Sequence, residues 1–222
     1  MAIVETSEAT SVADEGYVRI RTDIIFGRLK PSQRLRLEVV RQDYGLSVTT
    51  LREILNRLAS ERLVLAEGKR GFEVAPISIE NLKELADLRL LLECHAIDQS
   101  FTRADVEWEG RVVSAHHKLA TTEKLMKSQI GSSEQWKQYD SEFHQALISN
   151  CGSVTLMEAH AAAFDRYFRY QMIAFQFRDK APIHQHKELL DCALGRDAAR
   201  AKKILKEHVG DCVQNTISHW PD

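Results

Sequence analysis

The feature that most constrains the fold is an almost unbroken helical pattern over the larger, C-terminal part of the chain. Between Ser78 and Trp220, apolar residues recur at helical spacing and no alternating strand pattern of any length occurs. Pro182, the one proline inside this region, separates two helical stretches. We expect an all-helical bundle of six to seven helices, six of them at roughly 79–101, 104–128, 134–150, 153–176, 184–194 and 198–217.

The preceding segment has shorter elements in a recognisable order. A helix, a short helix, a glycine turn and a third helix are followed by two apolar runs that flank "EGKRG", which is typical of a β-hairpin. Gly45 breaks the second helix and Ser47 is a good N-cap for the third. The expected elements are helices at 17–26, 37–44 and 48–61 and short strands at 63–66 and 72–75.

This order is that of a winged helix-turn-helix, in which one helix fits the major groove of duplex DNA. The first turn of the third helix offers Thr49, Thr50 and Arg52, and an arginine there reaches a guanine edge or a phosphate. Further contacts are expected before the second helix and at the hairpin tip, from Arg34, Arg36, Lys69 and Arg70, with glycines that let the backbone approach closely. The alternative is a solvated helix on which Arg52 pairs with a neighbouring acid.

Charge and composition agree with a nucleic-acid partner for the first part only. Residues 16–77 hold 12 Lys/Arg and 7 Asp/Glu, whereas residues 78–222 hold 18 basic and 21 acidic side chains. Residues 1–15 lack a basic start and an apolar stretch, so we expect a disordered tail and not a secretion signal. No apolar run approaches the roughly 20 residues of a membrane span. Without an export signal, four scattered cysteines predict reduced thiols in the cytoplasm: Cys94, Cys151, Cys192 and Cys212.

Four residues of the helical region have the spacing of a metal site. Asp140 and His144 are four residues apart and therefore share one helix face. His186 begins the next-to-last helix and His208 lies late in the last, so an antiparallel turn brings them to one level. One carboxylate and three imidazoles in a bundle core suit Zn²⁺, Ni²⁺ or a similar divalent cation. The alternative is a set of hydrogen-bonded histidines without a metal.

A metal with open coordination positions attracts a carboxylate, and cations nearby would help to bind it. Arg89 lies among leucines in "DLRLLLE", and an arginine in such a stretch is costly to bury unless it meets an anion. Arg169 and Tyr170 in "DRYFRYQM" are further candidates for binding an effector. The alternative for Arg89 is an ion pair with Glu93 or another acid at a dimer surface.

Several segments resemble known families. "YVRIRTDIIFGRLKPSQRLR", "YGLSVTTLREILNRLASERLV" and "GKRGFEVAPIS" resemble the N-terminal domain of GntR-type regulators. "ENLKELADLRLLLECHA" and the helical remainder resemble the FCD ligand-binding domain of the FadR subgroup. The resemblance implies a mainly α homodimer, with an N-terminal winged helix-turn-helix followed by an all-helical FCD bundle. In relatives, the residues that correspond to Arg34, Thr49, Arg52 and Gly71 contact DNA.

The resemblance also bears on the effector site. It places metal ligands at Asp140, His144, His186 and His208, and its motif favours His186 over the neighbouring His184. The sequence departs from the family pattern at Thr50, Ile54 and Ser153, where many relatives have proline, alanine and asparagine. "RLRLEVVRQDYGL", "CGS" and "FDRYFRY" look closest to members that respond to dicarboxylates such as glutarate.

Together these observations predict a regulator of transcription and not an enzyme. We expect a repressor whose binding to operator DNA is relieved by a small carboxylate at or near a metal. One alternative is a metal-responsive regulator without an organic effector. Another is a metal-dependent hydrolase, for which only Glu142 offers an acid or base, directed away from the ligands. The expected divisions are a tail at 1–15, a DNA-binding domain at 16–77, and an effector-binding and dimerisation domain at 78–222.

Overall fold

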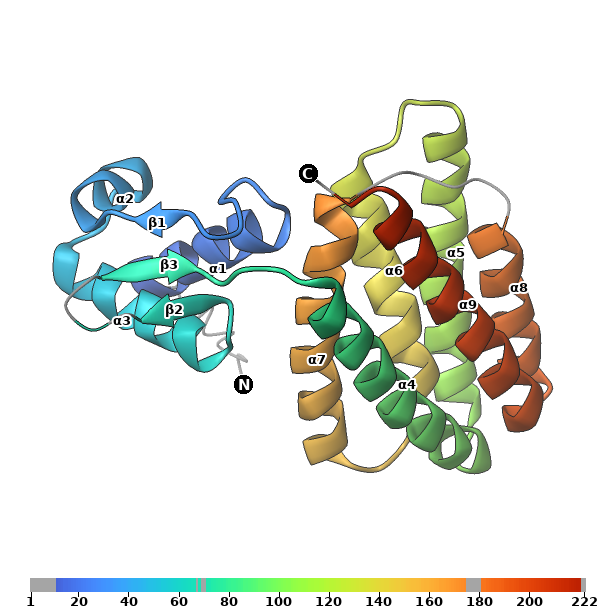
Figure 1. The fold of residues 1–222 in the computed structure, drawn as a ribbon. Coiled ribbons are helices and arrows are strands. Elements are labelled where there is room, and N and C mark those ends of the chain that lie inside the picture. The colour runs from blue at the N-terminus through green and yellow to red at the C-terminus, as the bar shows by residue number, and fades with distance from the viewer. Residues whose placement is uncertain (1–10, 67, 69–70, 175–180, 221–222) are drawn as a thin grey trace, which may run out of the picture. The chain divides into compact units, whose positions relative to one another are not determined.

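The computed structural model describes residues 11–66, 68, 71–174 and 181–220, which form two compact units (Figure 1). The first unit ends at Ile77 and the second begins at Ser78. Helices dominate both units, and the described strands all lie in the first. The mainly α fold with a small wing sheet agrees with the sequence prediction.

The first unit consists of three helices and a small antiparallel sheet. The strand order is β1-β3-β2, with Leu35 opposite Phe72 and Val64 opposite Val74. Alternate strand residues face the core, so both β3 ends contribute buried side chains. The elements are α1 (Val12–Ile25), β1 (Arg34–Leu35), α2 (Leu37–Tyr44), α3 (Val48–Ser60), β2 (Val64–Ala66) and β3 (Phe72–Val74).

The position of α3 follows from the residues at its start and along one face. Gly45 has a φ of +67°, which lets the chain turn sharply after α2. Ser47 then caps α3, because its Oγ accepts a hydrogen bond from the Thr50 N–H. The apolar face of α3 packs into a single core that α1 and the sheet complete, through Ile20, Ile24, Leu51, Ile54, Leu55, Leu58, Leu63 and Val74.

Two details of the first unit differ from the prediction. Helix α1 begins at Val12, so residues 12–15 are helical and the expected tail and helix start at residue 17 are wrong there. Ser11 caps this start by accepting from the Asp14 N–H. Residues 1–10 lie outside the described residues. Strand β1 was not predicted, because a two-residue strand is too short to show alternation.

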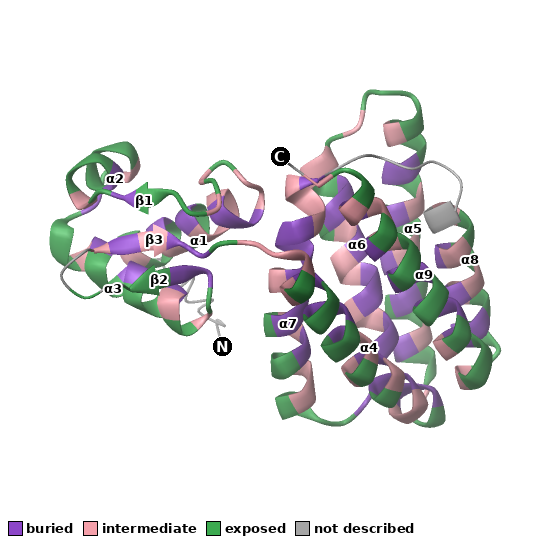
Figure 2. Cartoon of the chain, viewed as in Figure 1, coloured by how far each residue is buried: buried purple, intermediate pink, exposed green. Residues whose placement is uncertain are grey.

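The second unit is a bundle in which α5 packs mainly on α6, α4 on α7 and α9, and α8 on α9. Buried positions line the inner faces of its helices (Figure 2). The helices are α4 (Ile79–Thr102), α5 (Val106–Lys127), α6 (Ser133–Ile148), α7 (Val154–Ile173), α8 (Ala181–Leu194) and α9 (Ala198–Ser218). Within the described ranges this gives the six helices that the sequence predicts.

Pro182 does not separate two helices as expected. Helix α8 begins at Ala181, three residues before the predicted start, so the proline lies in its first turn. A helix tolerates proline there because the first N–H groups have no intrahelical acceptor. None of the helices in the described part of the chain has the length and apolar character of a membrane span.

Candidate DNA-binding face and metal centre

The first turn of α3 presents Thr49 and Arg52 to solvent. The Arg52 side chain has no acidic partner among the described residues, so the alternative in which it pairs with a neighbouring acid finds no support. An exposed guanidinium with five donors remains available to a base edge or a phosphate. Thr50 differs, because it is half-buried and its Oγ1 lies 2.9 Å from the Ser47 Oγ within the helix cap.

The other predicted DNA contacts are placed in part. Arg34 and Arg36 are exposed on either side of the buried Leu35, at the entrance to α2. Gly71 has a φ of +92°, a backbone conformation that glycine adopts without strain. The wing cations Lys69 and Arg70 lie outside the described residues.

A neighbouring arginine on α3 has a structural role instead. The Arg57 guanidinium lies 3.6 Å from the centre of the Tyr17 ring and 3.8 Å from the Glu61 carboxylate. Tyr17 donates a hydrogen bond of 2.5 Å to the same Glu61. These contacts tie α3, the predicted recognition helix that would enter the DNA groove, to α1.

In the second unit, the four predicted metal ligands meet inside the bundle. Asp140 and His144 come from α6, His186 from α8 and His208 from α9, and all four are at most 3% exposed. One ligand atom from each residue lies within 4.8 Å of the others. His184 lies one turn from Glu188 at the surface, with its side chain 75% exposed, so geometry selects His186 over its rival.

Outer partners orient each imidazole of this cluster. The Nδ1 atom of His186 lies 2.8 Å from Glu123, and the Nδ1 atom of His208 lies 3.0 Å from Gln185. The Nδ1 atom of His144 faces Glu93 at 3.4 Å. Metal-binding histidines usually have such a partner on the nitrogen that does not bind the metal, because it fixes the ring. The arrangement therefore directs three Nε2 atoms towards Asp140.

The buried Nε2 atoms of His144 and His186 make no hydrogen bond in the structure. The Nε2 atom of His186 lies 3.3 Å and that of His144 3.9 Å from Asp140 Oδ1, without hydrogen-bond geometry. A buried polar atom without a partner costs free energy unless something satisfies it. An ion with nitrogen and oxygen ligands satisfies both atoms, so these residues fit zinc or a similar cation.

The surroundings set the protonation of this cluster. Burial, together with the charge of Arg89, lowers the pKa of His144 to about 4. Burial, together with the charge of His186, holds the pKa of His208 well below its usual value. Burial alone would raise the pKa of Asp140, but Lys137, His186 and His144 together outweigh it and hold that pKa well below its usual value. For His186, Asp140 and Glu123 outweigh burial and raise the pKa to about 8. A cation must displace that proton.

Arg89 lies beside the cluster and not at the surface. Its side chain is fully buried, its Nε donates to Glu93 at 2.6 Å, and its Nη2 lies 3.0 Å from His144 Nδ1. The predicted alternative partner, Glu93, is therefore present, but in the interior. The guanidinium also packs 4.5 Å from the centre of the Phe164 ring.

The other two predicted effector-binding residues are Arg169 and Tyr170 of α7. Arg169 is buried, and burial lowers its pKa to about 10. The Tyr170 hydroxyl donates to Asn81 Oδ1 at 2.9 Å and accepts from the Ser78 N–H, and its ring stacks on Trp220. These contacts place Tyr170 at the first turn of α4.

Sequence reasoning missed several residues that support the cluster. Lys137 is buried and donates to Asp140 Oδ2 at 2.6 Å, while His160 lies 2.8 Å from Glu93. Glu93 and Glu123 occupy inward positions of helices whose other buried residues are mostly apolar. Charged residues at core spacing are the signal that could have identified them. Glu142, the acid that a hydrolase would need, is exposed and pairs with Lys118 at 2.5 Å.

Comparison with known families matches both units. Residues 13–74 match the family described as bacterial regulatory proteins, gntR family, and residues 84–211 match the FCD domain. Among solved structures, McbR/YncC of E. coli has a TM-score of 0.79 and 18% identity, and covers 96% of this chain and 100% of its own. A GntR-type regulator of Rhodococcus sp. RHA1 has a TM-score of 0.76 and 22% identity, with 94% and 99% covered. These structures support the fold.

Two relatives found by sequence are more similar to this chain in sequence than these two structures are. The HTH-type transcriptional regulator BphR of Paraburkholderia xenovorans LB400 is 36% identical over 209 residues, which cover 93% of this chain and 85% of the relative. The HTH-type transcriptional repressor GlaR of Escherichia coli K12 is 32% identical over 203 residues, which cover 88% and 91%. None of these relatives is described as an enzyme. The chain therefore belongs to the GntR family of bacterial regulatory proteins, and is a DNA-binding transcriptional regulator with a C-terminal FCD domain.

Proposed function

We propose that this regulator is a repressor whose hold on operator DNA is released when a small carboxylate binds at a divalent metal in the FCD domain. It acts as a homodimer in the cytoplasm. The metal ligands are Asp140, His144, His186 and His208, and the ion is zinc or nickel. The repressor assignment rests on similarity to GlaR, which is named as a repressor.

The contact between Arg89 and His144 carries the effector proposal. A guanidinium only donates hydrogen bonds, so His144 Nδ1 accepts from Arg89 Nη2 and the proton of the neutral ring lies on Nε2. When Nε2 serves as a metal ligand, Nδ1 must hold the proton, and Glu93 is placed to accept it. Arg89 Nη2 then loses the nearer of its two acceptors, keeps only the 3.5 Å contact to Glu93 Oε2, and has an N–H free for the oxygen of an anion.

The balance of buried charge supports the same conclusion. Among the described residues, the interior of the bundle holds three cations, Arg89, Lys137 and Arg169, and three carboxylates, Glu93, Glu123 and Asp140. A divalent ion bound by neutral imidazoles adds two positive charges that nothing buried offsets. Isolated charge in a protein interior is costly, so an anionic ligand is favoured. A dicarboxylate such as glutarate restores neutrality.

On the DNA side, we assign base or phosphate contacts to Arg34, Arg36, Thr49, Arg52 and the wing residues Lys69, Arg70 and Gly71. Thr50 supports this face by closing the cap of α3. Arg169 and Tyr170 of α7 belong to the effector response. Because Tyr170 holds the first turn of α4, a shift of α7 on effector binding would reach the residue at which the second unit begins.

The test starts from a duplex selected from a random DNA library with the purified protein. Operator affinity is measured for metal-free protein, for zinc-loaded protein, and with a panel of mono- and dicarboxylates from acetate to adipate. We expect at least one dicarboxylate to weaken operator binding of the zinc-loaded protein about tenfold or more, which is ordinary for allosteric coupling. The metal-free protein should not respond.

Arg89→Lys is the informative variant, because lysine keeps a buried positive charge beside Glu93 but has no counterpart of the Arg89 Nη2 atom. It should retain zinc and operator affinity and lose the response to the acid. Arg200→Lys makes the same exchange at the exposed end of α9, where Arg200 pairs with Glu188, and should respond normally. If zinc alone changes operator affinity and no acid does, the metal-responsive alternative is correct. If Arg89→Lys responds like the wild type, the assignment of Arg89 is wrong.

A further inference from the structure

Cys212 lies on α9 one helical turn after the proposed metal ligand His208, so both side chains share one face of the helix. The Cys212 side chain is half-buried. Burial, together with the neighbouring Cys212, raises the pKa of the Tyr167 hydroxyl well above its usual value. The Tyr167 ring centre in turn lies 5.1 Å from the Arg89 guanidinium. The thiol therefore faces the same interior as Arg89 and the metal centre.

The nitrogen that His208 offers to a metal is the one next to this thiol. Gln185 Oε1 only accepts hydrogen bonds, so His208 Nδ1 donates to it and the Nε2 atom of the neutral ring keeps its lone pair. The Sγ atom of Cys212 lies 4.0 Å from that Nε2 atom. The corresponding Nε2 atoms of His144 and His186 are buried and make no hydrogen bond among the described residues. The sulfur therefore lies beside one of the three nitrogens that await an ion.

The distance between the two atoms suits ligands of a single ion. Zinc lies about 2.0–2.1 Å from a histidine nitrogen and about 2.3 Å from a cysteine sulfur. Two such ligands are therefore roughly 3.1 Å apart at a right angle on the ion, about 3.5 Å apart at the tetrahedral angle, and at most about 4.4 Å apart. The 4.0 Å between Cys212 Sγ and His208 Nε2 falls within this range. An ion bound by His208 is therefore within reach of the thiol.

We infer that Cys212 is a fifth, thiolate ligand of the metal. The inference rests on the metal centre of the proposed function and adds one residue to its ligands. The bond between Sγ and the ion forms as the Sγ–H proton leaves to solvent, and no electron is transferred. Zinc sites with four ligands expand to five, so the coordination number allows it.

A thiolate changes what the metal centre selects. Soft sulfur ligands favour zinc over hard ions such as Mg²⁺ and Mn²⁺, which prefer oxygen. The thiolate of Cys212 also offsets one of the two positive charges of the ion. The charge that remains still favours an anionic effector.

The test uses cobalt as the probe, because cobalt replaces zinc and its absorption spectrum reports the ligands. Metal-free full-length protein is titrated with cobalt(II) chloride without oxygen. Wild-type protein should show the weak visible bands of bound cobalt and an intense near-ultraviolet band from sulfur-to-cobalt charge transfer. Cys212→Ser should keep the visible bands and lose the charge-transfer band. Competition with a chelator should show that Cys212→Ala weakens zinc binding roughly 10–100-fold, as loss of even an outer partner of a metal ligand does.

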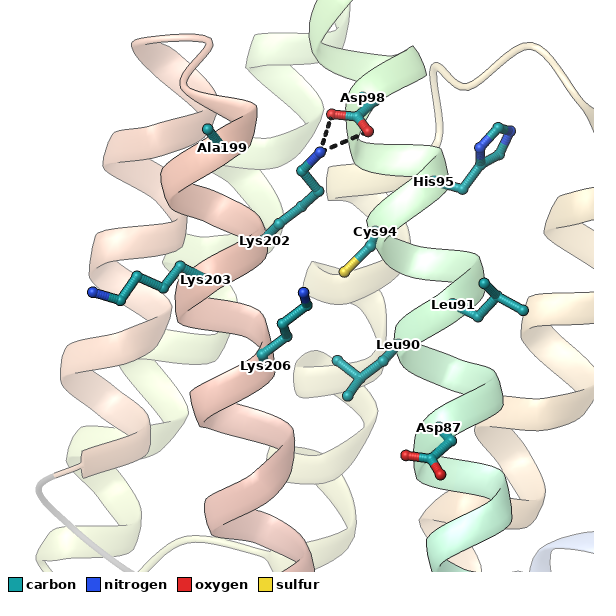
Figure 3. A pocket seen from close by; sticks show the side chains of 10 residues that line it. All are labelled: Asp87, Leu90, Leu91, Cys94, His95, Asp98, Ala199, Lys202, Lys203 and Lys206. Carbon is teal, nitrogen blue, oxygen red and sulfur yellow. Dashed lines mark hydrogen bonds and ion pairs between the residues drawn. The ribbon is translucent and has the colours of Figure 1, made fainter.

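A second cysteine of the same unit is the matched control. Cys94 is also half-buried, but it lies in an open groove between α4 and α9, with Lys202 and Lys206 reaching towards it from α9 (Figure 3). Cys94→Ser should retain both sets of cobalt bands and the zinc affinity of the wild type.

A second measurement uses the wild type alone and so does not depend on the folding of a variant. Zinc should suppress alkylation of Cys212 by iodoacetamide and leave that of Cys94 unchanged, as read by mass spectrometry of peptides. Bound cobalt without a charge-transfer band, or a band that survives Cys212→Ser, overturns the role of Cys212 and leaves the metal centre of the proposed function intact. A wild-type chain that binds neither cobalt nor zinc overturns both.

Discussion

In the first unit, every buried side chain among the described residues is apolar, whereas the second unit buries 13 polar or charged side chains. On its surface, the first unit presents Arg34, Arg36 and Arg52, whereas the polar groups of the candidate metal centre in the second unit are all buried. A dry core gives a rigid support for contacts made outside it, as DNA recognition requires. A core that contains charges is stable only when each buried charged group has a partner. The binding of an ion or an anion changes those partners, and the domain can therefore respond to it.

The largest expected effect concerns the matched charges of the bundle. Glu93→Leu leaves Arg89 buried without its counter-ion, which should cost about 3–5 kcal/mol of unfolding free energy. The double variant Arg89→Met/Glu93→Leu should regain most of that loss. All three tryptophans, Trp108, Trp136 and Trp220, belong to the second unit, so urea unfolding followed by tryptophan fluorescence reports on it alone. If the unfolding free energy of Glu93→Leu lies within about 1 kcal/mol of the wild-type value, the charged-core interpretation is contradicted.

The apolar core of the first unit should respond in a different way. Leu55 is fully buried, and Leu55→Ala should cost about 3 kcal/mol through lost burial and the cavity left behind. We expect faster amide hydrogen exchange in α1 to α3, measured by mass spectrometry, and an unchanged tryptophan transition. The two units would not be energetically separate if that transition shifted as well.

Metal removal should affect only the bundle. A ligand at 100 times its dissociation constant stabilises the folded state by about 2.7 kcal/mol, so chelation with EDTA should lower the midpoint of the tryptophan transition. His186→Ala should abolish zinc retention and the effect of EDTA together. His184→Ala, two residues away and exposed, should retain both. Equal zinc content in the two variants would exclude His186 as a ligand.

The smallest effect on folding and the clearest on DNA is expected at the surface of α3. Arg52→Ala should weaken operator binding by about 1–3 kcal/mol, and if Arg52 binds a phosphate the salt slope should fall by about one. Stability should change by less than about 0.5 kcal/mol, because the side chain has no partner to lose. Lys83→Ala removes one exposed charge from α4 and should leave DNA affinity unchanged. Equal affinity of Arg52→Ala and the wild type at all salt concentrations would contradict the recognition-helix assignment.

The sequence predicted those features that depend on local spacing. The boundaries of α2 and α3 follow from Gly45 and Ser47. Helical spacing pairs Asp140 with His144, and one antiparallel turn pairs His186 with His208, whereas the meeting of the two pairs was implied by the resemblance to FCD domains. The helix start at Val12 was missed because its cap, Ser11, lies in a segment whose composition resembles a disordered tail.

The supporting contacts of the site required tertiary structure. Glu123 on α5 and Gln185 on α8 become partners of His186 and His208 only when the helices are packed, and no spacing along the chain connects them. The exposure of Leu88 and Leu91 could not be predicted either, because leucines lie on every side of α4 in this stretch and the sequence does not show which of them are buried. Periodicity shows that a helix has an inner face, but not which of its residues the neighbouring helices cover.

The near-complete burial of the four ligands has a kinetic consequence. With Asp140, His144, His186 and His208 between 0% and 3% exposed, an ion or effector reaches them only when the bundle opens. Such openings occur on timescales from microseconds to seconds. In stopped-flow mixing, the rate of the response should therefore level off as the concentration of carboxylate rises, at a value set by the opening rate of the helices.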